Sequence, residues 1–114
     1  MEIILHNSIA EIISDEILIN EVQDALDIMA DCRYQGADSL IIHEKNLCPE
    51  FFDLKTKIAG DILQKFSNYR MRLAIVGDFS KFTSKSLRDF IYESNKGKLV
   101  GFVGSVEEAL GRFA

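Results

Sequence analysis

Short apolar runs separated by polar turn residues divide the chain into a regular series of elements. Residues 2–13, EIILHNSIAEII, form two such runs on either side of Asn7 and Ser8, which are residue types that favour turns, so they predict a β-hairpin. Three later runs are almost purely apolar, as is typical of strands covered on both faces of a parallel sheet. They are Leu40–His43, RLAIVGD at 72–78 and KLVGFVG at 98–104.

Helical spacing of apolar residues marks the segment after the hairpin. Asn20 is placed to cap a helix, with Gln23 at the capping-box position, and Gly36 ends that helix. Its apolar positions are Val22, Ala25, Leu26, Met29 and Cys32.

A longer helix is expected from Pro49 to about Ser67. Asp53 and Lys57 form an i,i+4 pair outside its apolar stripe, which consists of Phe51, Phe52, Leu54, Ile58, Ala59, Ile62, Leu63 and Phe66. Gly60 lies inside this helix at a cost of about 1 kcal/mol relative to alanine. We therefore expect a neighbouring backbone to pass close to Gly60.

Two shorter helices complete the series. One is expected from about Ser84 to Asn95, with Gly97 as its stop. The other follows Ser105 and Glu108, which form an S-x-x-E capping box. The resulting order predicts an α/β fold: a mixed, mostly parallel sheet with an N-terminal β-hairpin and helices on its faces, in one domain over residues 1–114.

Composition narrows the classes of partner. The formal net charge is -5, from 18 acidic and 13 basic residues, which opposes binding to nucleic acid because phosphate recognition needs a concentrated basic surface. No apolar run approaches the roughly 20 residues that span a bilayer, and the start, MEIILHNS, has no signal-peptide pattern. We expect a cytoplasmic protein without a nucleic-acid or membrane partner.

The two cysteines, Cys32 and Cys48, are expected to be free thiols. Neither belongs to a CxxC or Cys/His pair with zinc spacing, so we expect no metal, and no cofactor motif is present.

Candidate ligand-binding residues follow the predicted parallel strands, because open α/β sheets favour ligands beyond the carboxyl ends of their strands. The candidates are His43, Glu44, Asp78, Ser80, Thr83, Ser84 and Lys85. The GDFSKFTSKS stretch at 77–86 could bind an anion through N–H groups and lysines. In the alternative interpretation, Thr83 or Ser84 only caps the next helix and Asp78 stabilises the turn. No catalytic set is identified, so enzyme activity stays open.

Cys48 precedes Pro49, a residue favoured at the first position of a helix. A thiol at a helix N-terminus is stabilised as the thiolate, so Cys48 is a possible redox residue. The competing interpretation, which we favour, is a buried cysteine at the start of a packed helix.

FFDLKTKIAGDILQKF and RLAIVGDFSKFTSKSLRDFIYESNKG resemble a bacterial family known only as a domain of unknown function, number forty-one eighty. The resemblance extends from VQDALDIMADC to FVGSVEEAL and implies no activity. The element order is also similar to that of the anti-sigma-factor antagonist domain, called STAS or SpoIIAA-like. This second resemblance implies a SpoIIAA-like fold and a regulatory role.

In the antagonist family, a serine after the central strand accepts a regulatory phosphate. The corresponding stretch here, HEKNLCPEFFD, contains no serine or threonine, so the resemblance does not carry that switch over. By position, Cys48 is the residue that could replace it, through thiol oxidation.

Three functions follow from these observations. The leading hypothesis is a non-catalytic protein-interaction or regulatory module of STAS-like type, with an unknown protein partner. The alternative is a protein or enzyme that binds a small anionic molecule at the carboxyl ends of the strands. A redox sensor using Cys48 is the third. A homodimer, through a sheet edge or an exposed apolar patch, is compatible with each.

Overall fold

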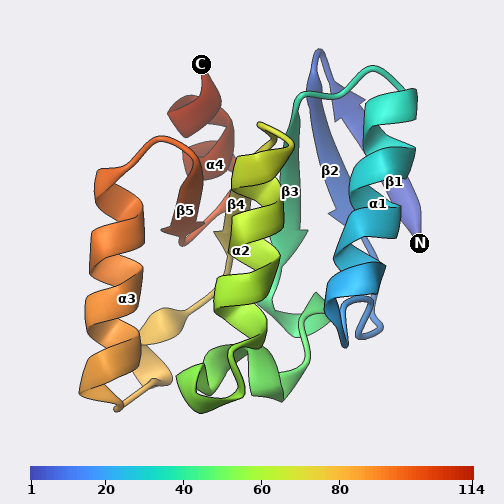
Figure 1. The fold of residues 1–114 in the computed structure, drawn as a ribbon. Coiled ribbons are helices and arrows are strands. Elements are labelled where there is room, and N and C mark those ends of the chain that lie inside the picture. The colour runs from blue at the N-terminus through green and yellow to red at the C-terminus, as the bar shows by residue number, and fades with distance from the viewer.

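The computed structural model describes residues 1–114 as one five-stranded sheet with four α-helices (Figure 1). The strands are β1 (Glu2–His6), β2 (Ile9–Ile13), β3 (Ser39–His43), β4 (Arg72–Val76) and β5 (Val100–Val103). They lie side by side in sequence order, with β1 antiparallel to β2 and every other pair parallel. The predicted mixed, mostly parallel sheet with an N-terminal hairpin is confirmed.

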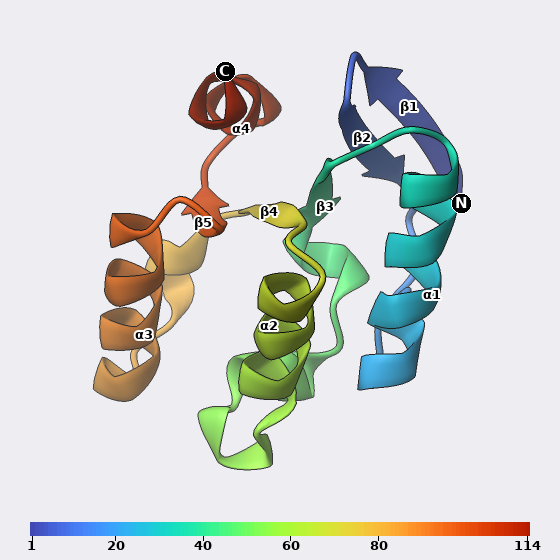
Figure 2. The same cartoon turned by 45° about the horizontal axis from the view of Figure 1, so that its top comes forward.

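The helices divide unequally between the two faces of the sheet. They are α1 (Val22–Tyr34), α2 (Ile58–Asn68), α3 (Lys85–Lys96) and α4 (Val106–Phe113). Figure 2 shows α1, α2 and α3 on one face and α4 alone on the other, near β5. Strand order never reverses, so the sheet lacks the switch point at which ligand crevices usually open in α/β folds.

Two apolar clusters correspond to these two faces. On the three-helix face, Leu40, Ile42, Leu73 and Ile75 of the central strands pack against buried residues such as Met29 and Phe66. On the other face, the alternate residues Ile41, Ala74 and Val103 pack under Ala109 and Phe113 of α4. The near-continuous apolar strands of the sequence are therefore explained by cover on both faces.

The hairpin turn and three of the predicted helix ends have the expected chemistry. Asn7 takes a φ of 58°, a left-handed conformation that asparagine adopts more readily than most residues. Ser84 Oγ accepts a hydrogen bond from the Leu87 N–H, and Ser105 Oγ accepts one from the Glu108 N–H. Gly36, after α1, has a φ of 97°.

The predicted continuous helix from Pro49 to Ser67 is wrong in its first half. Two short 3₁₀ turns, Pro49–Phe52 and Leu54–Thr56, precede α2, and Lys57 takes a φ of 65° between them and the helix. Side chains favour these turns: Asp53 Oδ1 accepts from the Lys55 N–H, and Thr56 Oγ1 donates to the Glu50 and Asp53 carbonyls. No Asp53–Lys57 ion pair forms.

Two further details differ from expectation. The first helix is capped at Glu21 rather than at Asn20, with Asp24 at the capping-box position. The Asp24 carboxylate accepts hydrogen bonds from the N–H groups of Asn20 and Glu21. Gln23 instead donates to Asp27. Gly60 has open space where a Cβ would lie, so the expected close backbone contact is absent.

A fully buried Asn46 joins the loop after β2 to the end of β3. Its Nδ2 donates to the carbonyls of Ser14 and Glu16, each at 2.8 Å, and its Oδ1 accepts from the His43 N–H. The backbone carbonyl of Asn46 accepts hydrogen bonds from the N–H groups of Leu18 and Ile19. This one side chain fixes the loop that borders the carboxyl ends of the strands.

Candidate functional site

A shallow groove of about 350 Å³ lies beyond the carboxyl end of β3. Its lining residues are Ile17, Glu44, Lys45, Leu47, Pro49, Phe52, Lys81 and Phe82. The rings of Phe52 and Phe82 stack there, with their centroids 4.8 Å apart. Of the residues predicted to bind a ligand, only Glu44 lines this groove.

Glu44 is engaged by groups that follow β4. Its Oε2 lies 2.6 Å from Lys81 Nζ, and its Oε1 accepts a hydrogen bond from the Asp78 N–H at 3.3 Å. Gly77 leaves the space for this carboxylate, because a Cβ there would meet Glu44. The Glu44–Lys81 ion pair therefore bridges the carboxyl ends of β3 and β4.

The other predicted residues after β4 stabilise turns and helix ends. Asp78 Oδ1 accepts hydrogen bonds from the N–H and the hydroxyl of Ser80, and these bonds lower the pKa of Asp78. Ser84 caps α3, and Lys85 forms an ion pair with Asp89 at 2.7 Å. Thr83 is exposed beside them.

His43 lies on the opposite face of the sheet from the three helices. Its Nε2 is 3.9 Å from Glu11 Oε2, while the other Glu11 oxygen lies 2.8 Å from His6 Nε2. Glu11 is buried, and a buried carboxylate needs polar partners. The two imidazoles are these partners, and all three side chains lie on the part of the sheet face that α4 does not cover. No group of three His, Cys, Asp or Glu side chains is arranged to hold a metal ion.

Cys48 is buried at the start of the first 3₁₀ turn, with Pro49 next to it. Its Sγ lies 3.7 Å from the Asn20 carbonyl, to which the thiol donates. Cys32 is buried in α1, and burial, with the nearby Asp31 carboxylate, raises the pKa of Cys32 to about 11. Both thiols are shielded from solvent.

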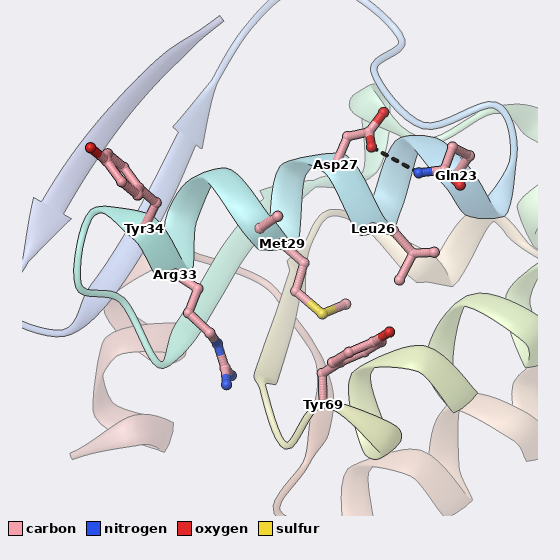
Figure 3. A pocket seen from close by; sticks show the side chains of 8 residues that line it. Gln23, Leu26, Asp27, Met29, Arg33, Tyr34 and Tyr69 are labelled. Atoms are coloured by element: carbon pink, nitrogen blue, oxygen red, sulfur yellow. Dashed lines mark hydrogen bonds between the residues drawn. The ribbon is translucent and has the colours of Figure 1, made fainter.

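A second hollow, of about 550 Å³, lies between α1 and the end of α2. Figure 3 shows Leu26, Met29 and Arg33 of α1 extending toward Tyr69, whereas Asp27 and Tyr34 point away from it. Tyr69 follows the last residue of α2 and is 55% exposed. We call this hollow the α1–α2 groove.

One acidic and one basic side chain line the α1–α2 groove. Asp24, Asp27 and Asp31 recur along α1 at helical spacing, and Asp27 is among the lining residues. Arg33 supplies positive charge at the far end of the helix. The groove therefore combines an apolar centre with a polar border in which Asp27 and Arg33 carry opposite charges.

Several of these residues were not found from the sequence. The sequence places Leu26 and Met29 in a core stripe, which is confirmed for Met29, whereas Leu26 is only half-buried. Tyr69, a large aromatic residue just beyond a helix, is the available signal of an exposed apolar surface. Glu11 interrupts the apolar run of β2, which was the available signal for a buried carboxylate. Nothing in the local sequence connects Glu44 with Lys81, because their contact depends on the neighbouring positions of β3 and β4.

No helix of the structure has the length and apolar character needed to cross a membrane.

Among curated proteins, no sequence matches the chain. One family model, described as "Domain of unknown function (DUF4180)", matches residues 5–113, which is nearly the whole chain and all four helices. The chain therefore belongs to the DUF4180 family.

Proposed function

We propose that the chain is a non-catalytic protein-interaction module of STAS-like, SpoIIAA-like type, and that the α1–α2 groove receives its partner. The element order supports the STAS-like assignment: a hairpin is followed by strands that alternate with helices and pair in sequence order. The observation that carries the binding proposal is the groove itself, which leaves Tyr69 and neighbouring apolar side chains in contact with solvent.

The shape of the α1–α2 groove suits a segment of another protein. Protein interfaces concentrate their binding energy in a few aromatic or apolar residues surrounded by polar ones. Tyr69 and Leu26 offer such a centre, and Gln23, Asp27 and Arg33 form a polar border. An amphipathic helix that lies across α1 would bury this centre.

The charge of α1 indicates the chemistry of that segment. Asp24, Asp27 and Asp31 outnumber Arg33 along the helix, and the whole chain carries a net charge of -5. A partner segment with lysine or arginine beside its apolar residues would complement this excess of acidic side chains on α1. Its association should therefore weaken as salt concentration rises.

Site-specific photocrosslinking tests this proposal. A photoreactive phenylalanine derivative placed at Tyr69 should cross-link a protein from a lysate of the source organism. The same derivative at Tyr92, which is 64% exposed on α3 and outside the groove, is the matched control. Equal products at both positions, or none at Tyr69, would contradict the proposal.

A binding measurement with the purified partner completes the test. Tyr69→Ser should weaken association at least about tenfold, as expected for a central aromatic contact, and Tyr92→Ser should leave it unchanged. A partner whose affinity ignores Tyr69→Ser would show that binding occurs elsewhere. Circular dichroism would verify that both variants fold.

The alternative function is binding of a small anion in the groove beyond β3. Lys45 and Lys81 flank the stacked rings of Phe52 and Phe82 there, an arrangement that fits an aromatic anion. Each lysine already has a carboxylate partner, Asp15 for Lys45 and Glu44 for Lys81, which an anion would have to displace. This competition makes the protein-interaction function the better supported of the two.

Calorimetric titration with phenyl phosphate and with inorganic phosphate tests the alternative. Binding of phenyl phosphate that is lost in Lys81→Ala, and retained in the exposed control Lys98→Ala, would support the groove as a ligand site. Loss in Lys85→Ala alone would instead favour the start of α3. Absence of heat with both probes would count against an anion site.

A further inference from the structure

The two edges of the sheet differ in how their outward backbone groups are used. At β5, the Phe102 N–H donates to Asn95 Oδ1 at 2.7 Å, and Asn95 Nδ2 donates to the Phe102 carbonyl at 3.2 Å. The Val100 carbonyl accepts from the Arg112 guanidinium at 3.2 Å. Side chains of the same molecule therefore close this edge to any further strand.

At the other edge, β1 presents free backbone groups. The Ser8 carbonyl accepts hydrogen bonds from the start of β3, so alternate residues of β2, beginning with Ile9, direct their backbone groups toward β1. Ile9 pairs with His6, and the same alternation directs the N–H and C=O groups of Ile3 and Leu5 away from β2. No side chain donates to or accepts from them.

Exposed apolar side chains gather at this open edge. Half of the exposed large hydrophobic residues of the chain lie in the hairpin or directly before it. They are Met1, Ile4, Leu5 and Ile13. Open strand edges usually carry lysine, proline or a bulge, which prevent pairing with another chain. The β1 sequence, EIILH, contains none of these.

We propose that β1 pairs antiparallel with β1 of a second copy of this chain, centred on Ile4, to form a continuous ten-stranded sheet. In this register Ile3 faces Leu5 of the second copy, and each such pair exchanges two backbone hydrogen bonds. Glu2 faces His6 of the second copy. The strand is thus complementary to itself in charge, in apolar contact and in hydrogen bonding.

The charge pairing selects this register over its neighbours. Glu2 and His6 lie on the same face of β1, since side chains alternate along a strand. His6 contacts Glu11 through Nε2, and in the protonated imidazole Nδ1 is also a donor, which can then bond Glu2 of the second copy. Moving the register by two residues places Glu2 or His6 opposite Ile4 and removes the charge contact.

A cysteine cross-link tests both the dimer and its register. Ile4 of the two copies would form a directly opposed pair without mutual hydrogen bonds, with Cα atoms about 4.5 Å apart. That separation lies within the range of a disulfide, about 4.4–6.8 Å. Ile4→Cys should therefore form a disulfide-linked dimer under mild oxidation, while the buried Cys32 and Cys48 do not compete.

Leu5→Cys is the matched control, because Leu5 is 44% exposed and Ile4 is 40% exposed. In the proposed register the two Leu5 positions are displaced by two residues along the strand, about 7 Å, and cannot be bridged. Cross-linking of Leu5→Cys as fast as Ile4→Cys would overturn the register. Failure of both would overturn the dimer.

Sedimentation equilibrium of the chain without an introduced cysteine gives an independent measurement of its oligomeric state. The wild-type chain should be a dimer, and Ile4→Lys should weaken the dimer at least tenfold, whereas Ile17→Lys, at an exposed position outside the edge, should not. A monomeric wild-type chain would overturn the proposal. Tyr69→Ser should leave the dimer intact, so failure of the α1–α2 groove proposal is distinguishable from failure of this one.

Discussion

The Glu44 side chain lies directly against Gly77, across the ends of the neighbouring strands β3 and β4. A Cβ on Gly77 would lie 2.7 Å from Glu44 Cβ and 2.6 Å from its Oε1. The missing side chain is therefore what allows Glu44 to reach the Asp78 N–H and Lys81. The ion pair that bridges the ends of β3 and β4 therefore depends on a glycine at position 77.

Replacing Gly77 with alanine should destabilise the protein. The new methyl group would displace Glu44, including its Cβ, and overpacking of this kind typically costs about 1–3 kcal/mol. The free energy of unfolding in urea would measure the loss. An unchanged midpoint would show that the segment around Glu44 adjusts freely.

Gly60→Ala should have the opposite effect. The glycine is exposed inside α2 with nothing within 4 Å of a Cβ position, so alanine gains helix propensity without a clash, about 0.5–1 kcal/mol. The same urea titration measures it. A destabilised Gly60→Ala variant would mean that the helix is constrained there by a contact that the structure does not contain.

Asn46→Leu should be strongly destabilising although it fills similar space. The Ser14 and Glu16 carbonyls and the His43 N–H would lose their partner, and each unsatisfied buried group costs about 1–3 kcal/mol. A combined loss above about 3 kcal/mol is expected from denaturant unfolding. Asn20→Ala, at an exposed neighbouring position, is the control and should change stability little.

Stability should fall between about pH 9 and pH 11 partly through Cys32. Burial raises the pKa of this thiol from 9.0 to about 11, so the unfolded chain ionises first. The contribution of the neutral thiol is complete below pH 9 and is lost as pH rises through the folded pKa. Unfolding free energies of wild type and Cys32→Ala should converge over this range, and parallel curves would refute the assignment.

Thiol labelling at neutral pH should be slow for both cysteines in the folded protein. Cys32 and Cys48 are buried, so a reagent reaches them only when the structure opens. Mass spectrometry after timed alkylation would follow each residue, with urea-unfolded protein as the reference. Rapid, selective labelling of Cys48 would revive the redox-sensor interpretation.

The strands and their alternation with helices along the chain could be predicted because each strand is a short apolar run with turn residues at its ends. The start of α2 could not. Phe51 and Phe52 pack against the same apolar cluster as α2, so their spacing resembled a continuous helix. The turns themselves depend on Asp53 and Thr56 side chains, whose hydrogen bonds compete locally with helix formation.

In the groove beyond β3, the sequence predicts the position of Glu44 but not its partner. Glu44 follows β3 as expected, but its partner Lys81 comes from the next strand–helix connection, and only the pairing of β3 with β4 brings them together. The α1–α2 groove was missed because the apolar period shows which residues face inward and not how completely α2 covers them. Coverage is a property of helix spacing in three dimensions.

Because every strand pairs with the strand that precedes it in the sequence, the sheet can grow in the direction of synthesis. Each new strand finds its neighbour already in place, and none must insert between two others. Pairing two strands that are neighbours in the sequence closes a shorter loop than pairing strands in a reordered sheet. The shorter loops lower the entropic barrier to folding. Emerging from the ribosome, the chain would expose few unpaired strands at any moment, apart from the β1 edge.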